Sequence, residues 1–322
     1  MTGSEDGLVV GIDIGGTKVL AAEVDPEGRI LRTARHETPG RLVDVALVEK
    51  ALTAALDDVA AGRQVAAVGL AAAGFVDAAG ERVRFAPHLP WRDAPVRDRL
   101  AERWGTTVAL DNDANCVARA EAAYGAAHGA ASALVVTLGT GIGGAVVVDG
   151  VVLRGHNGMA GEFGHMQVVP EGQACECGRR GCWEQYCSGN ALVRLARDQV
   201  GRMPTLLDEL CGGDPTRLTG PMVSQAAEEG DLLARQAFAS VGDWLGVGVA
   251  NLVAALDPEV VVIGGGVSVA GDLLLDPIRE SYLQHLPARG YHPEPQFVIA
   301  ELVNDAGVVG AADLARVHAR TR

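Results

Sequence analysis

The chain alternates between short apolar runs, which predict buried strands, and longer stretches with helical periodicity. The first run, Leu8–Ile14 (LVVGIDI), predicts a strand that breaks at Gly15-Gly16, and Val19–Val24 predicts the return strand. Further strands are predicted at Val65–Ala71, Thr107–Leu110, Val260–Ile263 and Phe297–Leu302, and helices at 42–60, 113–124, 232–256 and 307–318.

The opening pattern occurs a second time. Ala133–Leu138 predicts a strand, Gly139–Gly141 a turn and Gly144–Val148 a return strand, with Gly15 and Gly139 124 positions apart. Each unit is followed by helices and further strands, so we expect a duplicated α/β domain; the period is too long for a solenoid. Residues 150–190 interrupt this rhythm and are rich in Gly, Cys and His, which indicates an insertion that carries function.

Composition and charge limit which binding partners and which cellular compartment we expect for this protein. The 322 residues allow two domains, and 27 basic against 41 acidic residues give a net charge of −14 with no basic run, which argues against nucleic acid. The first residues lack the features of a signal peptide, and no apolar run approaches the length of about 20 residues that spans a bilayer. We therefore expect a cytoplasmic protein, in which crowded cysteines are better explained as metal ligands than as disulfides.

Glycine-rich turns at the ends of three predicted strands are candidate phosphate sites. Glycine permits positive φ and lets a phosphate approach backbone N–H groups, the neighbouring Thr and Lys can contact phosphate oxygens, and Asp13 can hold Mg²⁺ through water. Tight hairpin turns and packing glycines are the alternatives; neither a P-loop nor a dinucleotide-binding glycine motif is present. The candidate residues are Asp13, Gly15, Gly16, Thr17 and Lys18, then Gly139, Thr140 and Gly141, and finally Gly264, Gly265 and Gly266.

A Cys₃His set predicts a structural zinc site. His165, Cys175, Cys177 and Cys182 form the pattern H-x9-C-x-C-x4-C. Zn²⁺ takes four tetrahedral N and S ligands, and four protein ligands leave no open position for catalysis. A reduced cysteine cluster without metal is the alternative.

Two glutamates flank the predicted zinc loop. Glu162 precedes His165 by three residues and Glu184 follows Cys182 by two. A metal would fix both carboxylates, and preorganised carboxylates are good acceptors for sugar hydroxyls. The alternative is that both are solvated loop acids.

The segment Asp111-Asn112-Asp113-Ala114-Asn115 follows a predicted strand and opens a helix. Asp111 or Asn112 is a candidate helix cap. Phosphoryl transfer needs a carboxylate that accepts the proton of the attacking hydroxyl, and Asp113 is the candidate for this base. Asn112 can both donate and accept hydrogen bonds to neighbouring hydroxyls.

Together these motifs resemble the ROK family of bacterial sugar kinases and sugar-responsive repressors. The matching pieces occur in the expected order over most of the chain, and Gly181–Leu192 (GCWEQYCSGNAL) looks most like the glucokinases of actinobacteria. The pieces are Asp13–Lys18 (DIGGTK), Asp111–Asn115 (DNDAN), Leu138–Gly144 (LGTGIGG), Gly158–His165 (GMAGEFGH) and Cys175–Glu184 (CECGRRGCWE).

The resemblance implies a duplicated actin-like, RNase H-like α/β fold of two lobes with the active site in the cleft. We expect a small lobe of residues 1–112, joined by 303–322, and a large lobe of 113–302 with the zinc loop at 158–187. The implied reaction is transfer of the γ-phosphoryl group from ATP·Mg to the 6-hydroxyl of glucose, with Asp113 as base and the glycine turns holding the nucleotide. The implied sugar contacts are Gly74, Asn112, Asp113, Glu162, His165 and Glu184.

Two departures from the family pattern leave the choice of sugar open. Ala73-Gly74 stands where many members carry Pro-Gly, and His88 stands where many carry Asn. Fructose, mannose or an N-acetylhexosamine is the alternative substrate, and polyphosphate is an alternative donor. A repressor would carry a DNA-binding helix-turn-helix before Asp13, which lies only 12 residues after Met1. The resemblance also suggests a homodimer or tetramer.

Overall fold

The computed structural model describes residues 7–321 of the chain. Contacts divide them into two compact units: unit 1 holds the residues up to Ala131, Ala145–Gly161 and those from Asn304 onward, and unit 2 holds Ser132–Gly144 and Glu162–Val303. The predicted lobe boundaries stay a prediction.

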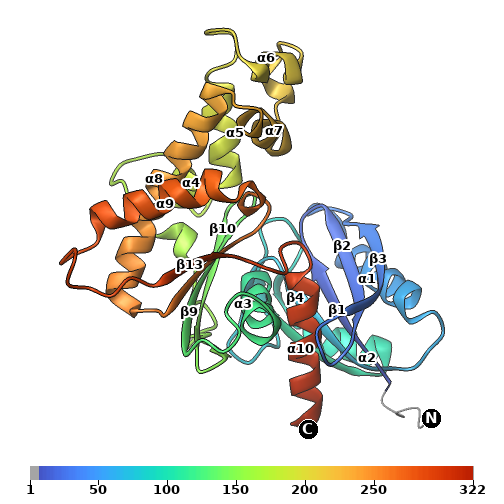
Figure 1. The fold of residues 1–322 in the computed structure, drawn as a ribbon. Coiled ribbons are helices and arrows are strands. Elements are labelled where there is room, and N and C mark those ends of the chain that lie inside the picture. The colour runs from blue at the N-terminus through green and yellow to red at the C-terminus, as the bar shows by residue number, and fades with distance from the viewer. Residues whose placement is uncertain (1–6, 322) are drawn as a thin grey trace. The chain divides into compact units, whose positions relative to one another are not determined.

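The first five-stranded sheet has the order β3-β2-β1-β4-β8 (Figure 1). β1 and β2 form an antiparallel hairpin around the first glycine turn, whereas β1, β4 and β8 run parallel. A smaller sheet has the order β5-β6-β7. The strands are β1 (Leu8–Ile14), β2 (Lys18–Val24), β3 (Ile30–Glu37), β4 (Val65–Ala72), β5 (Phe75–Val76), β6 (Val83–Phe85), β7 (Arg92–Ala94) and β8 (Thr107–Asn112).

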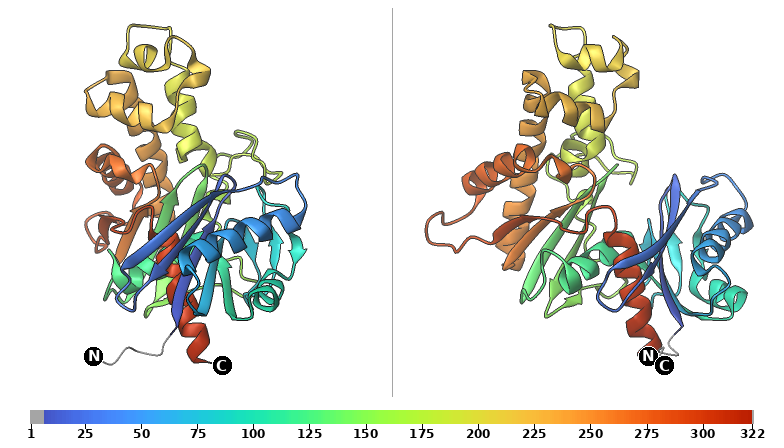
Figure 2. Two further views of the ribbon diagram at one scale, coloured as in Figure 1. Left: turned by 90° about the vertical axis from the view of Figure 1, so that its right-hand side faces the viewer. Right: turned by 45° about the vertical axis from the view of Figure 1, so that its right-hand side comes forward.

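The two faces of this sheet are covered in different ways. Alternate residues such as Val10, Ile12 and Leu70 form the core together with α1 and α2. On the opposite face α10 packs against β1 and β4 and also contacts α3; Figure 2 (right) shows α1 and α10 on opposite sides of the sheet. These helices are α1 (Val45–Ala60), α2 (Val96–Trp104), α3 (Asp113–Tyr124) and α10 (Ala306–Arg320).

Small residues let α10 approach the sheet closely. A Cβ added to Gly11 would lie 1.8 Å from the carbonyl oxygen of Val308, and one added to Gly69 would lie 1.7 Å from that of Ala311. Both distances are far below van der Waals contact, so the backbone of this helix rests directly on the two central strands.

The second five-stranded sheet repeats the first, with the order β11-β10-β9-β12-β13. β9, β12 and β13 are parallel, and β10 pairs with β11 in an antiparallel hairpin, so the predicted duplication is confirmed. The strands are β9 (Ser132–Leu138), β10 (Ile142–Val148), β11 (Val151–Val152), β12 (Val260–Gly264) and β13 (Gln296–Ile299). The prediction of a last strand over Phe297–Leu302 was wrong at its end: the ladder stops at Ile299, and Ala300 N donates to Ile263 O before the chain turns.

The helices of unit 2 pack around α8, which contacts α4, α5, α7 and α9. By length and composition α8 could span a membrane, but half of its most apolar window is buried inside the protein, as in a core helix. The helices are α4 (Glu184–Cys187), α5 (Gly189–Arg197), α6 (Leu206–Cys211), α7 (Gly220–Glu228), α8 (Leu232–Leu256) and α9 (Asp272–His285), with short 3₁₀ turns η1 (Phe163–His165), η2 (Pro215–Arg217) and η3 (Ser268–Ala270).

Candidate active site

In unit 1 the candidate residues gather at the carboxyl ends of β1, β4 and β8. The strand register aligns Asp13 with Ala71, and Ala71 with Asp111, one residue before the ends of these strands. Because carboxyl ends of parallel strands share one edge of a sheet, this places Asp13, Gly74 and Asp113 together, as such folds place their ligand sites.

The β8–α3 junction holds Asp113 in a fixed orientation. Asn112 is the N-cap of α3: its Oδ1 accepts from Asn115 N at 3.1 Å, which resolves the alternative between Asp111 and Asn112. The same side chain donates through Nδ2 to Gly74 O at 3.1 Å and to Asp113 Oδ1 at 2.9 Å. Ala114 N also donates to Asp113 Oδ1, at 3.0 Å, so one carboxylate oxygen is engaged twice.

Two carboxylates at this edge have raised pKa values. Burial, followed by the charge of Asp113, raises the pKa of Asp13 to about 7, against the opposing charge of Lys18. Burial also raises the pKa of Asp113, although the Ala114 N–H and the Asn112 amide favour its ionised form. Two partly buried acids, one of which raises the pKa of the other, are typical of sites that bind a cation or move a proton.

The first glycine turn lies between β1 and β2 as predicted, with Thr17 exposed and Lys18 opening β2. A Cβ on Gly16 would lie 2.7 Å from Cβ of His88, so the turn packs directly against the loop in which this chain departs from the family pattern. That loop is held by Arg92, whose Nη1 donates to the carbonyl oxygens of Ala86, Leu89 and Trp91.

In unit 2 the other two glycine turns also share a sheet edge. Gly264 ends β12 in register with Thr137, and a Cβ on Gly265 would lie 2.5 Å from Leu138 O, so this turn packs against the end of β9. Gly189 N donates to Gly139 O at 2.9 Å, which ties the start of α5 to the turn between β9 and β10.

The four predicted zinc ligands come together. Their donor atoms lie within 4.8 Å of one another; Cys177 Sγ and Cys182 Sγ are 3.6 Å apart, and Cys175 Sγ lies 3.7 Å from His165 Nδ1. A tetrahedral ion with Zn–S bonds of about 2.3 Å separates two thiolates by about 3.8 Å, so the donor set fits Zn²⁺. Burial raises the pKa of the Cys175 and Cys182 thiols, so metal binding would have to release their protons.

Glu184 connects this cluster with the glycine turn. Its Oε1 lies 3.2 Å from Cys175 Sγ and 3.5 Å from His165 Nδ1, and a Cβ on Gly141 would lie 2.5 Å from its Oε2. Glu162 lies at the start of η1, where its carbonyl oxygen accepts from His165 N at 3.1 Å. Both predicted glutamates are therefore next to the Cys₃His cluster, Glu184 through its side chain and Glu162 through its backbone.

Comparison with known proteins decides the family. The family model described as "ROK family" matches residues 9–318. The chain belongs to the ROK family. A glucokinase of Streptomyces coelicolor is 42% identical over 313 residues, which cover 96% of this chain and 98% of that protein. A putative xylose repressor of a Caldicellulosiruptor species is 30% identical over 94% of this chain and 77% of its own length.

A solved ROK structure confirms the fold. The ROK family glucokinase of Streptomyces griseus, in complex with glucose and AMPPNP, superposes with a TM-score of 0.90 at 43% identity, covering 97% of this chain and 100% of that one. The predicted duplicated, actin-like two-lobe ATPase fold of ROK sugar kinases is thereby confirmed.

Two residues in contact with the candidate site were missed by the sequence analysis. Gly307, in the first turn of α10, lies against Asp13, since a Cβ there would be 3.0 Å from Asp13 Oδ2. Arg154 forms an ion pair with Asp111 at 3.2 Å. Gly307 lies 294 positions and Arg154 43 positions from its partner, and neither belongs to a motif with a stated chemistry, so no local pattern could identify them.

Proposed function

We propose that this chain is an ATP-dependent kinase that phosphorylates glucose at the 6-hydroxyl. The carrying observation is the position of Asp113 at the carboxyl edge of the parallel strands, beside Asp13 and the first glycine turn. The glucokinase relative and the solved glucokinase with glucose and an ATP analogue support this choice of sugar and donor.

Asp113 acts as the general base. Its Oδ1 is occupied by Asn112 Nδ2 and Ala114 N, which leaves Oδ2 as the less encumbered oxygen for the proton of the sugar hydroxyl. Burial raises the pKa of this carboxyl, so it accepts a proton more readily than a solvated aspartate. Phosphoryl transfer otherwise depends on positioning and on neutralising charge.

The glycine turns hold the nucleotide phosphates. Gly15, Gly16, Thr17 and Lys18 offer backbone N–H groups, a hydroxyl and an ammonium, and Asp13 would hold Mg²⁺ through water, which would neutralise phosphate charge. The glycines and Thr140 of the turns at 139–141 and 264–266 serve the same nucleotide.

The sugar hydroxyls are bound by the polar groups that the family resemblance implies. Asn112 and the Gly74 backbone that it orders serve the hydroxyls from unit 1. Glu162, His165 and Glu184 are the other implied sugar contacts, and His165 offers the sugar the ring nitrogen opposite Nδ1. His165 and the three cysteines would hold a structural Zn²⁺, which would keep these groups in place.

The remaining assignments follow from the same proposal. We propose a cytoplasmic enzyme that forms a homodimer or tetramer, with lobes of 1–112 joined by 303–322 and of 113–302. The net charge of −14 and the lack of a basic run give no support to DNA binding.

A coupled kinase assay tests the proposal. Glucose, mannose, fructose and N-acetylglucosamine are each combined with ATP and with polyphosphate, and the phosphorylated carbon is identified by NMR. We expect the highest kcat/KM for glucose with ATP, and glucose 6-phosphate as product. Absence of turnover with every sugar, or a product phosphorylated elsewhere, would refute the assignment, whereas preference for another hexose would correct only the substrate.

A further inference from the structure

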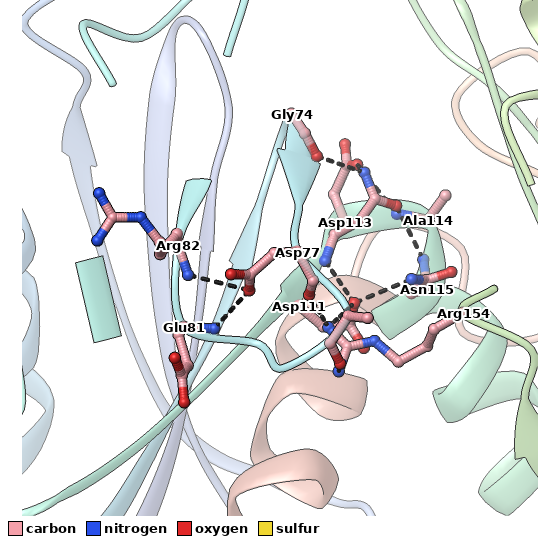
Figure 3. Close-up of polar contacts among 11 residues, drawn as sticks. Gly74, Asp77, Glu81, Arg82, Asp111, Asp113, Ala114, Asn115 and Arg154 are labelled. Atoms are coloured by element: carbon pink, nitrogen blue, oxygen red, sulfur yellow. Dashed lines mark hydrogen bonds and ion pairs between the residues drawn. The ribbon is translucent and has the colours of Figure 1, made fainter. Parts of the chain in front are cut away.

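The carboxylate of Asp111, two residues before the proposed base, accepts several hydrogen bonds. Its Oδ1 accepts from Asn112 N at 2.8 Å and from Asn115 Nδ2 at 2.9 Å, and lies 3.2 Å from Arg154 Nη2 (Figure 3). The side chain is only 4% exposed. A buried oxygen that takes three donors is best satisfied as an anion, and an anion there requires a cation nearby.

Arg154, in the segment after β11, supplies that cation. Its guanidinium also binds the turn at residues 77–82, which is another part of unit 1. Its Nη1 donates to Ala78 O at 3.0 Å and its Nη2 to Asp77 O at 3.1 Å. The turn that offers these carbonyls is closed by Asp77, whose Oδ1 accepts from Glu81 N at 2.8 Å and Arg82 N at 3.1 Å (Figure 3). One guanidinium therefore joins the 77–82 turn, the end of β8 and its own segment.

Asp111 controls the groups that orient the base. Asn115, held by Asp111 through its side chain, is also the residue whose N–H is capped by Asn112. The Asn112 amide in turn donates to Asp113 Oδ1 and Gly74 O. A shift of Asp111 would therefore move the cap, the Asn112 amide and the Asp113 carboxylate together.

We propose that the Asp111–Arg154 ion pair is the positioning device of the active site: it fixes the β8–α3 junction so that Asp113 presents Oδ2 to the sugar. Neither residue touches the reacting atoms, so both are positioning residues. The proposal rests on Asp113 being the base of a sugar kinase. The competing explanation is that the pair contributes to folding alone.

Four variants separate these explanations: Arg154→Met, Arg154→Lys, Asp111→Asn and the double variant Asp111→Asn/Arg154→Met. Arg82→Met is the matched control, because it removes a guanidinium that pairs with Asp93 rather than with Asp111, and it leaves the backbone N–H that closes the 77–82 turn in place. Steady-state kinetics are measured for glucose and ATP well below the melting temperature of each variant.

A positioning role gives a distinct kinetic pattern. We expect Arg154→Met to lower kcat roughly 10–100-fold with the KM for ATP within about twofold of the parent, since misplacing a reacting group by about 1 Å has effects of this size. The kcat of Arg154→Lys should lie between those of the parent and of Arg154→Met, because lysine keeps the positive charge but not the planar guanidinium with its paired N–H donors. The double variant should lose less than the product of the two single losses, because neither charge is left unpaired. Arg82→Met should keep the parental kcat.

Other outcomes would overturn the proposal in an identifiable way. An unchanged kcat in Arg154→Met with only a lower melting temperature would make the pair purely structural. Losses of kcat that multiply in the double variant would show that Asp111 and Arg154 act independently, which would overturn the pair as one positioning device. If Arg154→Met does not fold, Arg154→Lys and the double variant supply the same comparison. A parent enzyme that phosphorylates no sugar would refute the proposed function instead, and an active Asp113→Asn would refute the base.

Discussion

The raised pKa of Asp13 predicts that replacing this residue stabilises the metal-free protein while it abolishes activity. An aspartate with a pKa of about 7 in the folded chain and 3.8 as its ordinary value binds a proton more tightly when folded. The stability that this proton provides is full below the unfolded pKa and is lost as the pH rises through 7. Between about pH 5.5 and about pH 8 the loss amounts to about 2 kcal/mol.

Asp13→Asn has no such titration, so its stability should change less over the same interval. Urea unfolding of parent and variant, without Mg²⁺ or nucleotide, measures the difference at both pH values. Asp214→Asn is the matched control, because hydrogen bonds from Thr216 lower the pKa of Asp214 and leave it ionised throughout this range. If the stability difference between parent and Asp13→Asn is the same at the two pH values, the inferred burial and repulsion at this carboxyl are wrong.

Three further predictions concern the base, the metal and the packing of the last helix. Asp113→Asn should lower kcat roughly 10²–10⁴-fold, and near-normal turnover in the coupled assay would exclude it as the base. Cys177→Ser should lose zinc and raise the KM for glucose, whereas Cys211→Ser, at a buried cysteine outside the cluster, should retain the metal; elemental analysis decides this. Gly69→Ala should destabilise the protein by about 3 kcal/mol or more, because its Cβ would meet the Ala311 carbonyl; an unchanged urea midpoint would contradict that packing.

Local patterns in the sequence predicted the elements whose signals are local. Leu8–Ile14 and the helices at 113–124 and 232–256 agree with β1, α3 and α8, because buried strands and capped or long helices have a strong periodicity. β3 was missed because most of its side chains are exposed and polar, so its sequence lacks an apolar run.

The candidate site was predictable where its residues lie in compact motifs. The Cys₃His spacing predicted four donors that do come together, and the Asp-Asn-Asp segment predicted a strand-to-helix junction with a carboxylate at its start. The cation that balances Asp111 was not predictable, because Arg154 reaches it through a fold-dependent contact between distant segments. The roles of Glu162 and Glu184 as sugar contacts came from the family resemblance, because their positions in the sequence are equally consistent with solvated acids in a loop.

The helix α10 has a consequence for how the protein is made. The first sheet begins with residue 8, but the glycine-lined face of its two central strands is covered by residues 306–320. A nascent chain would have to keep that face uncovered, or shield it with a chaperone, until translation is nearly complete. Premature termination just before this helix should therefore yield an insoluble product even though almost every active-site motif has been synthesised.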